Sequence, residues 1–280
     1  MYEYLDITQE QSVSKDPPFD THSDPSRVRA KTDEVWQPQS GSIEFVDVWM
    51  HYRNNPPILK GISFKVQSGE RIGVCGRTGA GKSSIMVALF RIVEVRGRIL
   101  IDGTDISSVP LQHLRSKLAI IPQDPVLLTG SLRFQLDPFD AYSDLQVCEA
   151  LQSVGMQEAV RSFHDGLQEE VREGGENLSQ GQRQLICIAR ALLRQTSVLI
   201  VDEGTSAVDP HTDELVQRVL RDVARRGTTV LAIAHRLQTI LDFDRILVLG
   251  SGEILEYDTP AALTKDRNSP FSSMLGESEQ

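Results

Sequence analysis

The sequence contains no long uninterrupted run of apolar residues. No stretch approaches the roughly 20 apolar residues that a membrane-spanning helix needs, and the N-terminus has no apolar signal core. Cysteine is also scarce: Cys75, Cys148 and Cys187 are odd in number and far apart, which does not suit a disulfide framework or a metal site. We therefore expect reduced thiols in a cytosolic protein. Any membrane attachment is expected through a partner or through a part of the chain that is not present.

Basic residues are fewer than acidic residues. The chain has 29 basic against 39 acidic residues, a formal net charge of −10, and no local basic stripe interrupts this balance. Such a surface repels the phosphates of DNA and RNA, so no nucleic acid is expected as a partner. With 280 residues, 40% of them apolar, the chain has enough material for a folded core.

The chain divides by composition at about residue 40. Residues 1–40 are rich in Asp, Ser, Pro and Gln without an apolar period, which predicts a linker, and 41–280 is the folded part. A helical pattern fills 130–194, with Ser143 and Gln146 as a capping box. Short apolar runs predict strands at 43–48, 62–66, 71–75, 99–101, 118–121, 197–201, 228–234, 246–249 and 252–255. Because helical patterns separate several of the later runs, an α/β fold with a parallel sheet is predicted.

A glycine-rich segment follows the strand predicted at 71–75 and precedes a helical run. It reads GRTGAGKS and fits the pattern G-x-x-x-x-G-K-[ST], in which converging backbone amides and a helix N-terminus hold phosphate oxygens. Lys82 would hold the β and γ phosphates, and the Ser83 hydroxyl would ligate Mg²⁺. The alternative is a chance match in a glycine-rich turn, which the flanking strand and helix disfavour. The residues assigned to nucleotide binding here are Gly76, Arg77, Thr78, Gly79, Ala80, Gly81, Lys82, Ser83 and Ser84.

Acidic residues end another predicted strand, at 197–201. Asp202 would hold Mg²⁺ through water, and Glu203 would polarise the water that attacks the γ-phosphate. The alternative is that both acids only cap the following loop, which the glycine-rich segment makes less favourable. Asp209 precedes Pro210 and suits a helix N-cap as well as a nucleotide contact. His235 follows the strand at 228–234 and either orients the attacking water or caps the strand.

One further motif gives the sequence a family resemblance. Residues 178–182 read LSQGQ and closely resemble the LSGGQ signature of ABC ATPases. The resemblance extends from about residue 42 to the C-terminus, with motifs in family order. They are Tyr52, the glycine-rich segment, Gln123, the signature, Asp202 with Glu203, the segment 206–209 and His235. Segments 2–5, 48–53, 136–139 and 173–177 look still more like the second nucleotide-binding domain of a subfamily C, multidrug-resistance-associated type transporter.

The resemblance implies a fold and further residue roles. The fold is a RecA-like P-loop ATPase core with a mostly parallel sheet, an antiparallel β subdomain and an inserted helical subdomain at about 125–195. Tyr52 should stack on adenine, and Gln123 should reach Mg²⁺ and the attacking water. Ser179, Gly181 and Gln182 should face a nucleotide bound by a different domain, so catalysis would need a head-to-tail pair. Gln180, Gly204 and Leu128 depart from the usual family residues.

The function implied is binding and hydrolysis of ATP with Mg²⁺ to power a membrane exporter. The expected partners are a second, heterologous nucleotide-binding domain of the same transporter, and transmembrane domains through coupling helices at the cytoplasmic membrane face. The alternative is a nucleotide-sensing regulatory domain of an ABC-type channel. A soluble ABC ATPase acting on DNA or ribosomes is disfavoured by the acidic balance. GTP is disfavoured because an N-K-x-D motif is missing.

Overall fold

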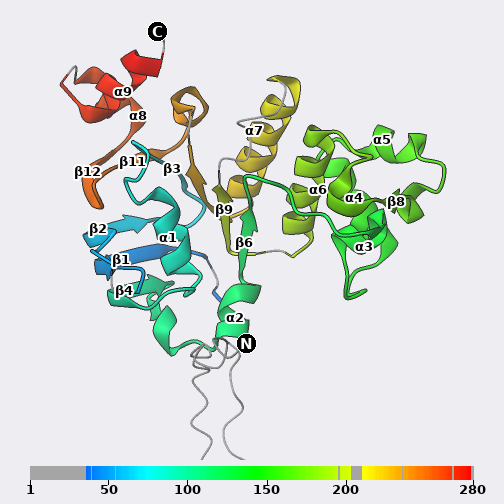
Figure 1. Ribbon diagram of the computed structural model, residues 1–280, viewed down its shortest axis with the longest axis horizontal. Helices are drawn as coiled ribbons and strands as arrows, with labels where there is room; N and C mark the ends of the chain where they lie inside the picture. Colours follow the sequence, from blue (N-terminus) through cyan, green and yellow to red (C-terminus); the bar gives the residue numbers. More distant parts are fainter. Residues whose placement is uncertain are drawn as a thin grey trace, which may run out of the picture.

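The computed structural model describes residues 36–38, 40–53, 55–194, 196–202, 210–234, 236–266 and 268–278. Strands and helices alternate along most of this part of the chain (Figure 1). The strands are β1 (Ile43–Met50), β2 (Leu59–Val66), β3 (Arg71–Gly76), β4 (Val95–Ile101), β5 (Thr104–Asp105), β6 (Leu118–Ile121), β7 (Gly130–Ser131), β8 (Glu170–Val171), β9 (Val198–Asp202), β10 (Thr229–Ile233), β11 (Arg245–Gly250) and β12 (Glu253–Asp258). The α-helices are α1 (Lys82–Leu89), α2 (Leu111–Ser116), α3 (Leu132–Leu136), α4 (Asp144–Ser153), α5 (Gln157–Ser162), α6 (Gln180–Leu193), α7 (Pro210–Arg225), α8 (Pro260–Lys265) and α9 (Pro270–Ser278).

The central six-stranded sheet has the order β12-β11-β3-β10-β9-β6. Its strands from β11 to β6 are parallel, and only the edge strand β12 runs antiparallel. Both faces are buried, which is why these segments read as nearly continuous apolar runs. Alternate residues separate into two cores: Leu231 and Ile233 face the antiparallel sheet, whereas Val230 and Ala232 face helices α6 and α7.

A second sheet, with the order β2-β1-β4-β5, is antiparallel and packs with α1 against one face of the central sheet. Phe45 and Phe64 stack inside it with ring centroids 4.6 Å apart. Strands β2 and β4 start earlier than the apolar runs predicted, because pairing with β1 extends to Leu59 and Val95. The predicted strand at 252–255 is displaced, because Ser251 and Gly252 form the turn that precedes β12.

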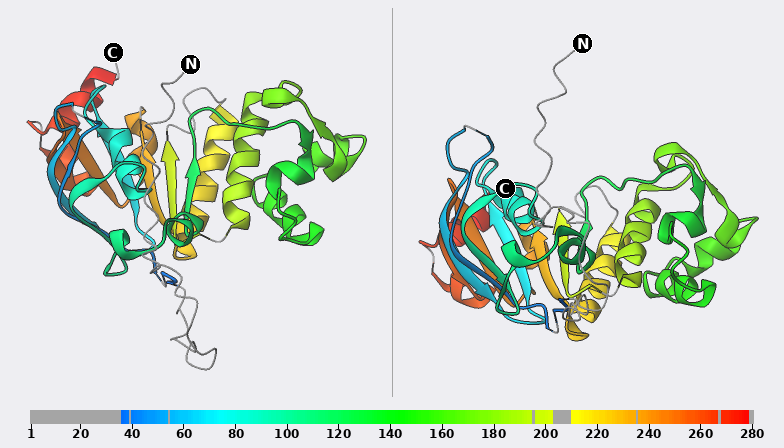
Figure 2. Two further views of the ribbon diagram at one scale, coloured as in Figure 1. Left: turned by 60° about the horizontal axis from the view of Figure 1, so that its bottom comes forward. Right: turned by 90° about the horizontal axis from the view of Figure 1, so that it is seen from below.

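The helices α3 to α6 form a lobe at one end of the molecule, beyond β6 and β9 (Figures 1 and 2). The buried Arg133 side chain organises its α3–α4 connection through ion pairs with Asp137, Asp140 and Asp144. The predicted capping box of Ser143 and Gln146 is confirmed at the start of α4. The predicted α/β fold, with its mostly parallel sheet, antiparallel sheet and helical insert, is therefore confirmed. In the part of the chain that is described, no helix is both long enough and apolar enough to cross a bilayer.

Candidate functional site

The carboxyl ends of β3, β10, β9 and β6 meet at one edge of the central sheet. The register pairs Ile233 of β10 with both Val74 of β3 and Asp202 of β9, and it pairs Ile121 of β6 with Val201. The glycine-rich loop, Asp202 and the segment leading to Gln123 therefore leave the sheet side by side. Open parallel sheets bind their ligands at this edge. The sequence placed these three features correctly relative to the strands that carry them.

The glycine-rich loop turns back sharply between β3 and α1. Gly76 lies against β11, where an added Cβ atom would be 2.2 Å from the carbonyl oxygen of Leu249. The Lys82 side chain folds back over the loop, and its Nζ donates to the carbonyl oxygens of Gly76 at 2.8 Å and of Arg77 at 3.3 Å. An ammonium group has three donors, so two hold the loop while one stays available to a ligand. Lys82 is 8% exposed, so its charge is only weakly shielded by water.

The N-terminus of α1 is open to an anion. Its N-cap is Gly81, which has φ 100° and supplies no side-chain hydrogen bond, and the first turn contains no acidic residue. The first backbone N–H groups of a helix have no partner within the helix, and the helix dipole makes this end positive. With Lys82 beside it, this arrangement fits the phosphate groups of a nucleotide.

A cavity of about 730 Å³ lies beside this loop. Loop residues 78–84 line one wall, and the β1–β2 connection at 55–58 lines another. Lys60 and Ser251, neither of which was predicted from the sequence, also line it. The volume suits a ligand of nucleotide size. Tyr52 is half-buried against the antiparallel core, just before the residues that border this cavity.

The residues predicted to hold Mg²⁺ offer oxygen ligands, which this ion prefers. Ser83 is exposed at the start of α1, Gln123 is exposed after β6, and Asp202 is half-buried at the end of β9. Within the described ranges no group of three His, Cys, Asp or Glu side chains is placed to hold a metal ion. Glu203, Asp209 and His235 lie outside the described residues. Their roles stay predictions.

The signature residues belong to a different part of the molecule. Helix α6 lies on the far side of β6 and β9 from α1 (Figures 1 and 2), so the chain does not bring its own signature to its own loop. Ser179 is the N-cap of α6: its Oγ accepts from the Gln182 amide at 3.1 Å, and the Gln182 side chain accepts from the Ser179 amide at 2.9 Å. The Ser179 hydroxyl keeps its own hydrogen as a donor. The capping box uses the Oε1 atom of the Gln182 side chain, and the expected contact of this residue with a nucleotide stays a prediction.

Cys75 precedes the loop without taking part in it. Burial raises the pKa of its thiol to about 12, against the opposing effect of the Lys82 charge. The thiol is therefore neutral at physiological pH and unreactive, as expected for a buried structural cysteine.

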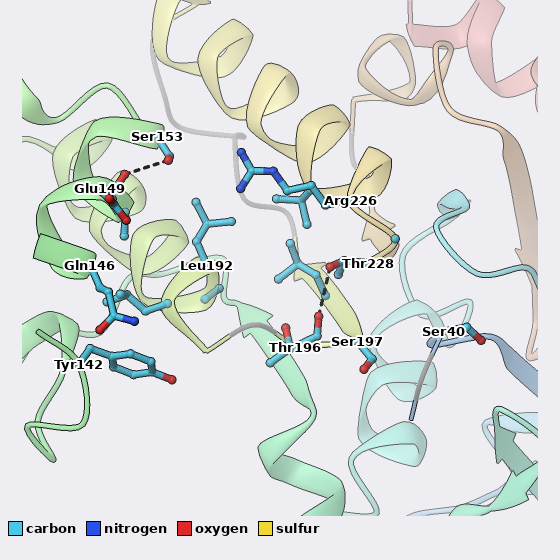
Figure 3. A pocket seen from close by; sticks show the side chains of 16 residues that line it. Ser40, Tyr142, Gln146, Glu149, Ser153, Leu192, Thr196, Ser197, Arg226 and Thr228 are labelled. Carbon is cyan, nitrogen blue, oxygen red and sulfur yellow. Dashed lines mark hydrogen bonds between the residues drawn. The ribbon is translucent and has the colours of Figure 1, made fainter. Parts of the chain in front are cut away.

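A second cavity, of about 650 Å³, is shown in Figure 3. It lies between the helical lobe and the amino ends of β9 and β10, where the Thr228 hydroxyl donates to the carbonyl oxygen of Thr196 at 3.2 Å. Arg226 and Glu149 line it from opposite sides. Because Asp202 is at the other end of β9, this cavity is separate from the loop site.

Comparison with known proteins shows a match to the ABC transporter family model over residues 59–206. Multidrug resistance protein mrp-7 of Caenorhabditis elegans is 48% identical over 91% of this chain and 17% of that protein. ATP-binding cassette sub-family C member 2 of Rattus norvegicus is 50% identical over 83% of this chain and 15% of that protein. The chain therefore spans less than a fifth of each of these relatives. The predicted resemblance to subfamily C is confirmed.

A solved structure also matches the fold closely. A bacterial Atm1-family ABC exporter with ATP bound superposes with a TM-score of 0.83 and 35% identity, over 88% of this chain and 43% of the exporter chain. The helical lobe and both sheets therefore correspond to an arrangement seen in an ABC exporter.

Proposed function

The chain belongs to the ABC transporter family and is one of its ATPase domains, and from this premise we propose that it powers a membrane exporter. Residues 41–280 are the nucleotide-binding domain, with the helical subdomain at about 125–195, and 1–40 link it to transmembrane domains. One observation carries the proposal: the open N-terminus of α1, the folded-back Lys82 ammonium and the 730 Å³ cavity lie together at the carboxyl edge of the sheet.

The residues of the loop bind the triphosphate. Their amides and the N-terminus of α1 receive the phosphate oxygens, and Lys82 donates to the β and γ phosphates. Ser83, Asp202 and Gln123 hold Mg²⁺, which neutralises phosphate charge when bound. The ring of Tyr52 stacks on adenine through its face, beside the β1–β2 connection.

Hydrolysis needs an oriented water molecule and stabilised charge. Glu203 accepts a hydrogen bond from that water and polarises it, His235 donates toward the γ-phosphate, and Gln123 orients the water from the β6 side. Asp209 helps to hold the loop that follows Glu203. These roles rest on the strand ends that carry the residues, which leave the same edge of the sheet.

The signature acts on a second, heterologous nucleotide-binding domain of the same transporter. The separation of α6 from α1 supports this, because the Ser179 hydroxyl and the Gly181 amide can serve only a loop on another domain. In a head-to-tail pair each loop would receive a signature from its partner. An isolated domain should therefore be a weak ATPase.

A surface for the transmembrane domains lies between the central sheet and the helical lobe. A groove of about 330 Å³ runs there along β6 and is lined in part by Ile120, Val126 and Cys187. Val126 in this lining and Leu128 two residues later are 65% and 59% exposed, so both side chains are available to a partner. We assign this surface to a short coupling helix from the cytoplasmic side of a transmembrane domain.

The decisive experiment is Glu203→Gln in the paired domains. Mg-ATP binding should stay within about twofold of wild type, because the amide is isosteric and the loop is untouched. Turnover should fall roughly a thousandfold, since the water loses its polarising carboxylate. Glu158→Gln, at an exposed position of α5, is the control and should leave both unchanged.

Wild-type turnover in the Glu203→Gln pair would contradict the assignment. A wild-type pair that changes conformation with nucleotide but sustains no hydrolysis would favour the regulatory alternative.

A further inference from the structure

The hairpin of β11 and β12 contacts the phosphate loop at both of its ends. Leu249, near the end of β11, pairs in register with Gly76 at the start of the loop. Two residues past β11 in the same turn, the amide of Gly252 donates a hydrogen bond to the carbonyl oxygen of Ala80 at 3.1 Å. One hairpin therefore holds the loop by backbone contacts at both Gly76 and Ala80.

The same turn is fixed on its other side by β2. The Lys60 amide donates to the Gly252 carbonyl oxygen at 2.9 Å. Gly252 has φ +87°, and a Cβ atom there would be 2.1 Å from the carbonyl oxygen of Ile58. Real Cβ atoms do not approach backbone this closely, so any side chain at 252 must push the turn and the backbone at Ile58 apart. Gly252 thus fills a tight space between the antiparallel sheet and the loop.

The bond to Ala80 determines where a neighbouring donor points. In a trans peptide the carbonyl and the following N–H point in opposite directions across a rigid plane. Because Gly252 holds the Ala80 carbonyl toward the hairpin, the N–H of Gly81 is directed to the other side, which is the inner side of the loop. Gly81 is also the N-cap of α1, so this peptide orients the first amides of the helix.

We propose that Gly252 is a positioning residue for the nucleotide. The β11–β12 turn holds the Ala80–Gly81 peptide in the orientation that the triphosphate needs. Binding then loses no conformational entropy in ordering this peptide. The inference rests on the proposed function, because it concerns the affinity of the same site. It assigns a role in nucleotide binding to the β11–β12 turn, which contains none of the predicted site residues.

The chain contains a matched control for this idea. Asp102 and Gly103 form the β4–β5 turn with φ 50° and +76°, close to the φ 51° and +87° of Ser251 and Gly252. A Cβ atom on Gly103 would meet nothing within 4 Å. Alanine therefore introduces the same kind of backbone strain at both positions, and only at 252 does it also displace the turn.

The test compares Gly252→Ala with Gly103→Ala in titrations with Mg-ATP. Gly252→Ala should raise the Kd about tenfold, whereas Gly103→Ala should leave it within about twofold of wild type. Gly103→Ala should also leave turnover of the paired domains near wild type, because a Cβ atom there meets nothing within 4 Å. A purely structural role would lower the melting temperature without separating the two Kd values.

Hydrogen exchange on the wild-type protein tests the same contact without a substitution, in case Gly252→Ala does not fold. Mg-ATP should slow exchange of the Gly252 and Lys60 amides more than that of amides in the Asp102–Gly103 turn. Equal Kd values for the two alanine variants, or no slowing at Gly252, would overturn the proposal. Failure of the wild-type protein to bind Mg-ATP at all would instead overturn the proposed function.

Discussion

The N-termini of helices α1 and α6 differ in what occupies their first amides. At α1 the cap is Gly81, which offers no side chain, and the first residues of the helix line the cavity beside the loop. At α6 the cap is Ser179, and the Gln182 amide is already bonded to its hydroxyl. The protein leaves the N-terminus of α1 without a side-chain cap, whereas at α6 its own Ser179 side chain binds the Gln182 amide.

In a third region, converging backbone amides bind a carboxylate of the protein itself. The backbone N–H groups of Ser40, Gly41 and Ser42 all donate to the carboxylate of Asp102, at 2.8 to 3.0 Å. This is an anion-binding concavity that the protein fills itself, and it fastens the chain that enters β1. The first turn of α1, in contrast, contains no acidic residue, so this helix end suits an external phosphate.

The largest effect in this comparison is expected from removing the cap of α6. Ser179→Ala should destabilise the domain by about 1 kcal/mol, since the Gln182 amide loses its acceptor. It should also lower turnover of the paired domains roughly tenfold to a hundredfold, because a donor to the partner's γ-phosphate is lost. Binding of Mg-ATP to the isolated domain should not change. Urea unfolding and steady-state ATPase assays measure the two effects.

Ser143→Ala is the matched control for this prediction. Ser143 and Gln146 form the same kind of capping box at α4, so the stability loss should be similar while turnover stays near wild type. If the two variants lowered turnover equally, the Ser179 hydroxyl would have only a structural role.

A smaller effect on stability is expected from removing the charge of Asp102, which binds the amides of Ser40, Gly41 and Ser42. Burial alone would raise the pKa of Asp102, but the hydrogen bonds from Ser40, Gly41 and Ser42 outweigh it and lower the pKa below its ordinary value. Since the folded-state pKa is depressed, the stabilisation is present above the unfolded-state pKa of about 4 and is lost as pH falls through the lower folded-state value. Asp102→Asn should cost about 1 kcal/mol at pH 7, after allowance for solvent screening.

Urea unfolding of wild type and Asp102→Asn at pH 7 and pH 3 checks this. The difference between them should shrink at the lower pH, and Glu94→Gln, at an exposed carboxylate, should show little difference at either. A difference that stayed constant with pH would mean that the Asp102 charge does not fasten the segment.

Local patterns in the sequence were enough to place the loop and Asp202, because strand ends and the following turn are encoded by adjacent residues. Lys60 and Ser251 were missed, since β2 and the β11–β12 turn reach the loop only through pairing between distant parts of the chain. The capping box that Ser179 and Gln182 form at the start of α6 was also missed. The spacing of Ser179 and Gln182 carried that signal, and the same spacing was recognised at Ser143.

The proposed ATPase function requires a triphosphate on the open end of α1, beside the Lys82 ammonium. Titration of Mg-ATP into wild type and Lys82→Met tests this most directly, with Lys265→Met, at an exposed lysine in the last turn of α8, as the control. We predict saturable binding to wild type and to the control, and binding about a hundredfold weaker to Lys82→Met. Equal affinity of Lys82→Met and wild type would contradict the account.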